Sequence, residues 1–320
     1  PTPWLPDWLS EEGFRGHAVV PLLIEGRAVG AMVIDSRQAR LMTDQETHFL
    51  RLMANQAAIA IETARLHREE MARHRLEEEM SIGQEIQLSM LPDSLPDAPG
   101  WEFAAAYEPA LLVGGDFYDF FELPDEPEQL GIVIADVSDK GVPAALYMAL
   151  SRTLIRTTAL SGRSPSAALA RANTLIMKDS KSNLFLTAFY AVLDTDTGRV
   201  VFANGGHNRP LWLHADSGVC EELFAQGIIL GAFDDIDLEE PVIDMAPGDA
   251  LILYTDGITD SMNNEGQMFD AARLRAVITA NAQASAEGLL AAIMDAVAAF
   301  SGDTPPSDDL TLVIIRRREA

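Results

Sequence analysis

ADVSDKGVPAALYM, residues 135–148, places two aspartates, a lysine and a glycine between two apolar stretches. The apolar run that leads into it, Gly131–Val137, predicts a buried β-strand, because short continuous apolar segments are typical of strands covered on both faces. Pro143 suits the first turn of a helix, and leucines recur every four residues from position 146. This stretch therefore predicts a strand, an acidic turn and a helix in succession.

The same kind of block pattern continues through the second half of the chain. Turn residues such as DTDTG at 194–198 separate neighbouring apolar runs, which favours antiparallel strands joined by hairpins. This pattern predicts an α+β fold with antiparallel sheets rather than a Rossmann fold. The other expected strands are Phe103–Tyr107, Leu186–Leu193, Val200–Asn204, Ala250–Thr255 and Leu310–Arg316, and the other expected helices cover about 166–177 and the region of 290–297.

Four aspartate-bearing segments lie beside these strands. Clustered carboxylates next to a core repel one another in a medium of low dielectric constant, and divalent cations relieve this cost. Carboxylate and carbonyl oxygens suit Mg²⁺ or Mn²⁺, and the segments lack the Cys and His pattern of a zinc site. For any single aspartate a turn or cap role is the alternative, but four segments together favour a metal site. The segments are GGDFYD (114–119), ADVSDKG (135–141), YTDG (254–257) and SDDLT (307–311).

Nucleophilic catalysis by a side chain has little support in the sequence. The single cysteine, Cys220, lies in a loop-like stretch and is interpreted as a bystander. His207 follows a predicted strand and two glycines, so it either reaches a site or braces its loop. Without a suitable nucleophile, the economical mechanism is attack by a metal-activated water.

The first 65 residues predict a small, incomplete module. Apolar runs at 17–24 and 28–34, separated by Glu-Gly-Arg, predict a β-hairpin. Thr43 with Glu46 three positions later forms a capping box, which marks the start of a helix. Two strands and a helix are too little for an independent domain, and the chain starts without Met, so we expect a fragment of a longer protein.

A long helix is expected to link this module to the rest of the chain. Between Asp44 and Leu91 the sequence has no proline and a single glycine. Leu52, Ile59 and Leu66 recur at intervals of seven residues among mixed charges, which resembles an imperfect coiled coil. A homodimer through this helix is therefore expected, and a solvated connector helix is the alternative.

The composition limits the partners. The 320 residues include 49 acidic and 23 basic side chains, giving a formal charge of −26, and three of the basic residues are lysines. Such a chain is repelled by phosphate backbones and anionic lipid, so neither nucleic acid nor a membrane surface is an expected partner. A single cysteine fits a reducing cytosol, and no apolar run is long enough to span a bilayer, so we expect a cytoplasmic protein without membrane insertion.

Six motifs occur in order along the chain. They are MLP (90–92) followed by Pro96, VGGDFYD (113–119), ADVSDKGVPAALYM (135–148), NGGHNRPL (204–211), LYTDGITD (253–260) and SDDLTLV (307–313). Together they closely resemble the SpoIIE/RsbU-type serine/threonine phosphatases, bacterial members of the metal-dependent PPM (protein phosphatase 2C-like) superfamily. The resemblance covers about residues 85–318, and residues 17–66 resemble the C-terminal half of a GAF sensory domain.

The resemblance implies a three-part organisation. Residues 1–65 would be the C-terminal part of a GAF domain, 66–94 a coiled-coil or regulatory linker helix, and 95–320 the phosphatase domain. The implied fold is a PPM-type, two-layer antiparallel β-sandwich flanked by helices, preceded by the long linker helix and the partial GAF α/β module.

The resemblance also implies a set of site residues and cofactors. The cofactors would be two Mn²⁺ or Mg²⁺ ions, and a metal-bridging water would attack the phosphate. The catalytic residues, acting through that water, would be Asp116, Asp136, Asp256 and Asp308. As metal ligands, Asp136 would bridge both ions, Asp116 and the Val137 carbonyl would complete the second ion, and Asp256 and Asp308 would hold the first. Behind these ligands, or around a weak third ion, would lie Asp119, Asp139, Asp260 and Asp309.

The implied activity is hydrolysis of phosphoserine or phosphothreonine on a regulatory protein, often a STAS-type anti-anti-sigma factor, under control of the sensor through the linker helix.

Two residues depart from the family's common pattern, because a small residue usually stands at the position of Asp139 and often an alanine at that of Gly205. A non-catalytic module that binds a signalling partner is one alternative. A nucleotide cyclase is another, because Gly114–Phe117 resembles the GGDEF signature, but the missing glutamate argues against it.

Overall fold

The computed structural model describes residues 11–38, 41–124, 126–179 and 183–319. The chain divides into two compact units, Pro1–Glu79 and Met80–Ala320, and the division falls inside a single long helix. None of the helices within the described ranges is both long and apolar enough to cross a membrane.

The first unit is built on a hairpin and the start of the long helix. Strands β1 (Gly16–Ile24) and β2 (Arg27–Ser36) pair antiparallel, as the sequence predicts. Helix α2 (Asp44–Leu88) begins at the predicted capping box. The Thr43 amide donates to Glu46 Oε2 at 2.9 Å, and the Glu46 amide donates to Thr43 Oγ1 at 3.3 Å.

The second unit contains, within its described residues, two five-stranded antiparallel sheets. The first has the order β10-β7-β6-β5-β4 and the second the order β3-β12-β11-β8-β9. The strands of the first sheet are β4 (Phe117–Leu123), β5 (Glu126–Val137), β6 (Leu186–Asp194), β7 (Arg199–Gly205) and β10 (Val242–Asp244). Those of the second are β3 (Trp101–Glu108), β8 (Leu211–Leu213), β9 (Cys220–Glu222), β11 (Ala250–Tyr254) and β12 (Leu310–Arg317).

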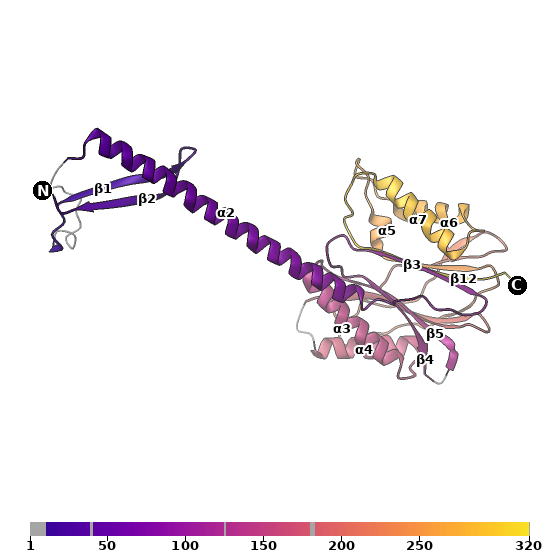
Figure 1. Ribbon diagram of the computed structural model, residues 1–320. Helices are drawn as coiled ribbons and strands as arrows, with labels where there is room; N and C mark the ends of the chain where they lie inside the picture. The colour runs from indigo at the N-terminus through magenta and orange to yellow at the C-terminus, as the bar shows by residue number, and fades with distance from the viewer. Residues whose placement is uncertain (1–10, 39–40, 125, 180–182, 320) are drawn as a thin grey trace. The chain divides into compact units, whose positions relative to one another are not determined.

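Helices cover the outer faces of the two sheets (Figure 1). Helices α3 and α4 pack on the first sheet, and α6 and α7 pack on the second. The helices of this unit are α3 (Val142–Ala159), α4 (Pro165–Asp179), α5 (Asp256–Asp260), α6 (Asp270–Ala280) and α7 (Ala286–Ser301). The predicted two-layer antiparallel β-sandwich flanked by helices is thereby confirmed.

Strand alternation explains why the central strands are continuously apolar. In β5, Ile132 and Ile134 face the opposite sheet, whereas Val133 and Ala135 face the helices α3 and α4. All four side chains are at most 1% exposed, so this central part of the strand is apolar on both faces. Each fully buried aliphatic side chain of this size contributes roughly 2 kcal/mol to stability. The same alternation in β12 buries one set of side chains between the sheets and the other under α6 and α7.

Candidate active site

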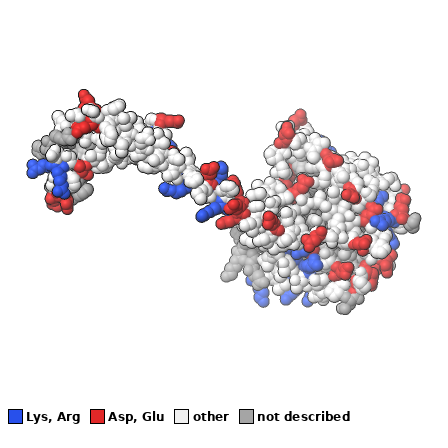
Figure 2. Space-filling view, in the orientation of Figure 1, with Lys and Arg blue, Asp and Glu red and all other residues white. Residues whose placement is uncertain are grey.

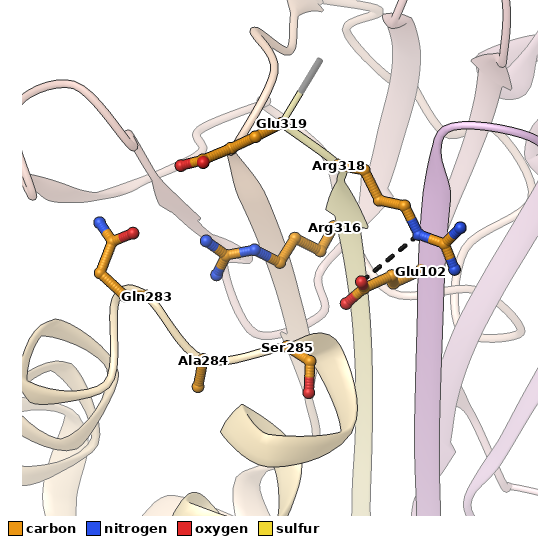
Figure 3. Close-up of a pocket in the computed structure, with 7 residues that line it drawn as sticks. All are labelled: Glu102, Gln283, Ala284, Ser285, Arg316, Arg318 and Glu319. Atoms are coloured by element: carbon orange, nitrogen blue, oxygen red, sulfur yellow. Dashed lines mark ion pairs between the residues drawn. The ribbon is translucent and has the colours of Figure 1, made fainter.

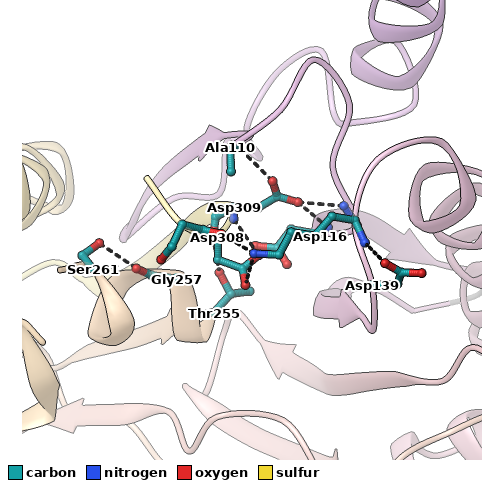
Figure 4. Close-up of polar contacts among 11 residues, drawn as sticks. Ala110, Asp116, Asp139, Thr255, Gly257, Ser261, Asp308 and Asp309 are labelled. Atoms are coloured by element: carbon teal, nitrogen blue, oxygen red, sulfur yellow. Dashed lines mark hydrogen bonds and ion pairs between the residues drawn. The ribbon is translucent and has the colours of Figure 1, made fainter. Parts of the chain in front are cut away.

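The ends of four strands bring the predicted aspartates together. Asp136 lies near the end of β5, Asp256 follows β11, and Asp308 and Asp309 precede β12. Asp116 immediately precedes β4, the neighbour of β5 in the first sheet. Figure 4 shows Asp116, Asp308 and Asp309 converging with Thr255 at the base of the group. Residues from both sheets therefore form one acidic site.

Asp116 is the most deeply buried of these carboxyl groups, with 2% exposure. The Thr311 hydroxyl donates to its Oδ2 at 2.7 Å. Burial, followed by the negative charge of Asp136, raises the pKa of Asp116 well above its usual value. This carboxyl group is thus held beside a like charge in a place from which water is excluded.

The pKa of Asp136 depends on the neighbouring carboxyl groups of the site. Burial and then the charges of Asp256, Asp308 and Asp309 raise its pKa to about 7, against a hydrogen bond with Asp116 that lowers it. A hydrogen bond between two carboxyl groups requires one of them to hold a proton. Burial, then Asp308 and Asp260, also raise the pKa of Asp256, while the charge of Lys140 lowers it. Burial and the neighbouring negative charges therefore favour the neutral forms of Asp116, Asp136 and Asp256.

Asp309 organises the loop that carries Asp116. Its Oδ2 accepts hydrogen bonds from the amides of Gly115 at 2.7 Å and of Asp116 at 3.4 Å, and its Oδ1 accepts one from the Ala110 amide at 2.8 Å (Figure 4). The carboxylate is 7% exposed. A buried acceptor for three backbone amides fixes the loop geometry, because each amide would otherwise be left unsatisfied.

Two glycines leave room for this arrangement. A Cβ atom at Gly115 would stand 2.9 Å from the carbonyl oxygen of Val137, the carbonyl predicted as a metal ligand. A Cβ atom at Gly257 would overlap the backbone carbonyl of Asp309. Only glycine allows the backbone to approach the acidic group so closely at these two positions.

Gln87, which the sequence analysis missed, joins the end of α2 to the same loop. Its side-chain amide donates to the Gly114 carbonyl at 2.5 Å, and its Oε1 accepts from the Gly114 amide at 3.1 Å. Gln87 is 5% exposed, although the neighbours Ile86 and Leu88 are exposed. The sequence signal for Gln87 is a polar residue between two apolar ones at the end of a helix, just before the MLP motif.

His207 braces a loop rather than reaching into solvent. Its Nδ1 forms a 2.8 Å hydrogen bond with the hydroxyl of Thr187, the residue that pairs with Asp136 across β5 and β6. The amide of His207 donates to Asn204 Oδ1 at 2.7 Å. Burial lowers the pKa of His207 to about 4 and raises the pKa of the Cys220 thiol to about 11. Neither side chain is therefore charged or activated near neutral pH.

Asp119 lies in a different environment from the other aspartates. Its carboxylate accepts from Arg156 Nη1 at 2.8 Å and is 3.0 Å from Arg152 Nη2, and both arginines belong to α3. The Asp119 side chain is 2% exposed. The sequence analysis placed it behind the ligands or at a third ion; in the structure, its contacts are those of a buried ion-pair cluster that ties β4 to α3.

Asp139 and Asp260, also expected behind the ligands, sit at turns. Asp139 has φ of 77°, in the left-handed region that favours glycine, and its Oδ1 accepts from the Lys140 amide at 2.8 Å. Asp260 ends the short helix α5 and accepts from the Thr259 hydroxyl at 3.3 Å.

The donor set fits a divalent cation by chemistry and by charge. The side chains of Asp116, Asp136, Asp256 and Asp308 offer only oxygen, and burial followed by mutual repulsion raises the pKa of the first three. Within the described ranges, no three His, Cys, Asp or Glu side chains already converge closely enough to hold a metal ion. These carboxylates would be the ligands of such a cation.

A separate pocket of about 310 Å³ lies away from the acidic site (Figure 3). Three of its charged groups have partners, because Arg318 lies 3.4 Å from Glu102 and Arg316 donates to the Ala282 carbonyl at 2.9 Å. Glu102 also accepts from the Ala286 amide at the start of α7. None of the predicted site residues lines this pocket.

The family assignment comes from comparison with known proteins. Residues 126–318 match the family model described as Stage II sporulation protein E (SpoIIE), and residues 1–62 match a GAF domain model. The chain is 31% identical over 266 residues to Protein IcfG of Synechocystis sp. (strain ATCC 27184 / PCC 6803 / Kazusa), an alignment that covers 75% of this chain and 41% of IcfG. It is 27% identical over 243 residues to Phosphoserine phosphatase RsbU of Bacillus subtilis (strain 168), covering 76% of this chain and 71% of RsbU.

The fold agrees with these sequence matches. The SiaA-PP2C domain of Pseudomonas aeruginosa superposes with a TM-score of 0.68 at 24% identity, covering 77% of this chain and 98% of that domain. The similarity to this solved structure establishes a PP2C-type fold. Since the SpoIIE model matches more than half of the chain, the chain belongs to the SpoIIE family.

Proposed function

We propose that this chain is a metal-dependent protein phosphatase that hydrolyses phosphoserine or phosphothreonine on a regulatory protein. The observation that carries the proposal is the acidic site itself, to which four segments contribute carboxyl groups, while neither His207 nor the Cys220 thiol is activated as a nucleophile. Such a site binds cations and has no side-chain nucleophile. The relative RsbU is named a phosphoserine phosphatase, which supports the same assignment.

Each group in the site has a proposed role. Asp116, Asp136, Asp256 and Asp308, with the Val137 carbonyl, would hold two Mn²⁺ or Mg²⁺ ions. When bound, such ions supply a water of lowered pKa and stabilise charge on the phosphoryl oxygens. Thr311 orients Asp116 through its hydroxyl, and Asp309 fixes the backbone that carries Asp116.

The substrate is proposed to be a phosphorylated STAS-type protein in the cytoplasm. Asp308 is 38% exposed and Asp256 is also partly exposed, so one side of the site is open to a phosphate carried by a folded partner. Asp and Glu outnumber Lys and Arg on the visible face of the second unit (Figure 2). This surface favours a partner that presents basic residues near its phosphorylated serine.

Phosphate release from a phosphoserine-containing STAS protein tests this function. We expect the full chain to release phosphate in Mn²⁺, with a rate that falls to background when EDTA removes the metal. A phosphotyrosine peptide of similar charge serves as the control substrate and should react much more slowly. Stable binding of the STAS protein without phosphate release would instead favour the non-catalytic module.

We further propose that α2 both pairs two chains and regulates the site. Leu52, Ile59 and Leu66 are each more than half exposed, which supports a helix whose apolar stripe pairs with that of a second copy. At the other end of α2, Gln87 holds Gly114, two residues before Asp116. A change in helix pairing would reach the site through this contact.

Gln87→Leu tests that route. Loss of two buried hydrogen bonds at about 1 kcal/mol each should lower the Mn²⁺-dependent rate by roughly tenfold or more. Gln84→Leu, one turn earlier on α2 and only partly buried, is the matched control and should retain the rate. Equal rates in the two variants would contradict regulation through Gln87, and a monomer in sedimentation equilibrium would contradict the dimer.

A further inference from the structure

The side chain of Lys140 is 44% exposed and extends to the acidic site. Its Nζ is 2.8 Å from Asp308 Oδ2 and donates to the backbone carbonyl of Ser307. Its charge also lowers the pKa of Asp256, against the burial and the neighbouring carboxylates that raise it. The ammonium group thus interacts with both aspartates proposed to hold the first metal ion.

The local backbone delivers Lys140 to this place. Asp139 adopts the left-handed conformation and accepts a hydrogen bond from the Lys140 amide, which fixes the turn between β5 and α3. The lysine side chain then extends to Ser307 and Asp308, 167 and 168 residues further along the chain. Among the described residues, Lys140 is the basic residue whose side chain forms an ion pair with a proposed metal ligand.

An ammonium group and a divalent cation seek the same oxygens. The ammonium has three N–H donors and one positive charge, and here it engages one carboxylate and one carbonyl. A divalent cation at Asp308 would carry twice the charge and would repel the ammonium at close range. Both cations therefore cannot occupy the Asp308 side of the site together.

We infer that Lys140 is a tethered cation that competes with the divalent metal ion for Asp308 and so weakens metal binding. This inference rests on the proposed function, because it takes Asp308 as a metal ligand. In the metal-free chain, Lys140 reduces the repulsion between Asp256 and Asp308. When the metal ion binds, Lys140 must leave Asp308, and the loss of this ion pair subtracts from the observed affinity.

Calorimetric titration of the full chain with Mn²⁺ tests the competition. Lys140→Met removes the competing charge and should tighten Mn²⁺ binding by roughly two- to fivefold, since a partly exposed ion pair no longer has to break. Lys140→Arg keeps a cation and should leave the affinity near that of the unmodified chain. Lys178→Met is the matched control, because it makes the same charge change at an exposed position near the end of α4.

A second readout does not depend on titration heats. The metal-free Lys140→Met variant should melt at a lower temperature than the unmodified chain, and saturating Mn²⁺ should raise its melting temperature by a larger amount. Unchanged or weaker Mn²⁺ affinity in this variant, while the unmodified chain binds Mn²⁺, would overturn the inference alone. If the unmodified chain binds no Mn²⁺ at all, both the inference and the proposed function are overturned.

Discussion

Asp136→Asn is expected to abolish Mn²⁺-dependent phosphate release, with kcat/KM at least about 10³-fold lower, since a neutral amide is a much poorer ligand than the carboxylate that would hold the metal ions. The same change should stabilise the metal-free chain, because it removes a buried negative charge that is repelled by Asp256 and Asp308. The melting temperature without metal should rise by roughly 3 °C or more. Hydrolysis of an aryl phosphate and calorimetric melting measure the two effects.

The pH dependence of this stabilisation has a defined sign. The pKa of Asp136 is raised to about 7 in the folded chain, above the ordinary value of about 3.9 for an unfolded aspartate. Between these two values the folded state binds more protons, so its stability falls as pH rises through about 7 and is greater at pH 5. The Asn variant should lose this dependence, and its gain in melting temperature should be larger at pH 8 than at pH 5.

Asp235→Asn, at an exposed loop position, is the matched control for loss of one carboxylate. It should leave both activity and the pH profile of melting unchanged. Full activity in Asp136→Asn, and likewise in Asp256→Asn, would exclude both residues from the catalytic machinery. A lower melting temperature for metal-free Asp136→Asn would contradict the electrostatic argument.

Asp119→Ala should produce the largest loss of stability. The substitution leaves Arg152 and Arg156 without their shared carboxylate, and the Arg152 side chain is only 17% exposed. Removing one partner of a buried ion pair costs about 3 kcal/mol or more, because the remaining charge cannot be solvated. The second unit should therefore melt roughly 6 °C or more below the unmodified chain. Thermal melting without metal ions measures this effect without interference from cation binding.

Glu222→Ala is the control for Asp119→Ala. Glu222 also lies between two arginines, at 3.2 Å from Arg209 and 2.8 Å from Arg275, but its side chain is 32% exposed. Exposed ion pairs are worth about 1 kcal/mol or less, so the loss should be correspondingly small. Equal effects of the two substitutions would show that burial does not decide the strength of the Asp119 cluster. A metal-dependent phenotype without a change in metal-free stability would instead favour a third-ion role for Asp119.

The sequence was sufficient for the elements with continuous apolar runs. The runs that correspond to β5, β11 and β12 predict strands buried on both faces, and the structure confirms them between the sheets and the outer helices. Strand β4 was not predicted, because its acidic residues Asp119 and Glu122 interrupt the apolar pattern and the segment was interpreted as a site motif. Strands β8, β9 and β10 have three residues each, which is too few for any periodicity.

Some residues of the candidate site could likewise be predicted from the sequence, and others could not. Aspartates at strand ends can be found from sequence, because the strand pattern already places them at a sheet edge. The position of Asp119 required the structure, since Asp116 and Asp119 are three residues apart and successive residues of a strand point to opposite faces. Gln87 and Lys140 required it too, because their partners lie 27 and 168 residues away and no local pattern specifies such contacts.

The place of β12 in the second sheet has a consequence for biosynthesis. This strand lies between β3 and β11, and Asp309 just before it supplies the acceptor for the loop around Gly115. The first sheet can assemble as soon as β10 has left the ribosome, but the second cannot join β3 to β11 until residues 308–317 have been synthesised. In a nascent chain, Asp308 and Asp309 therefore join the other aspartates of the acidic site only after β12 has been synthesised.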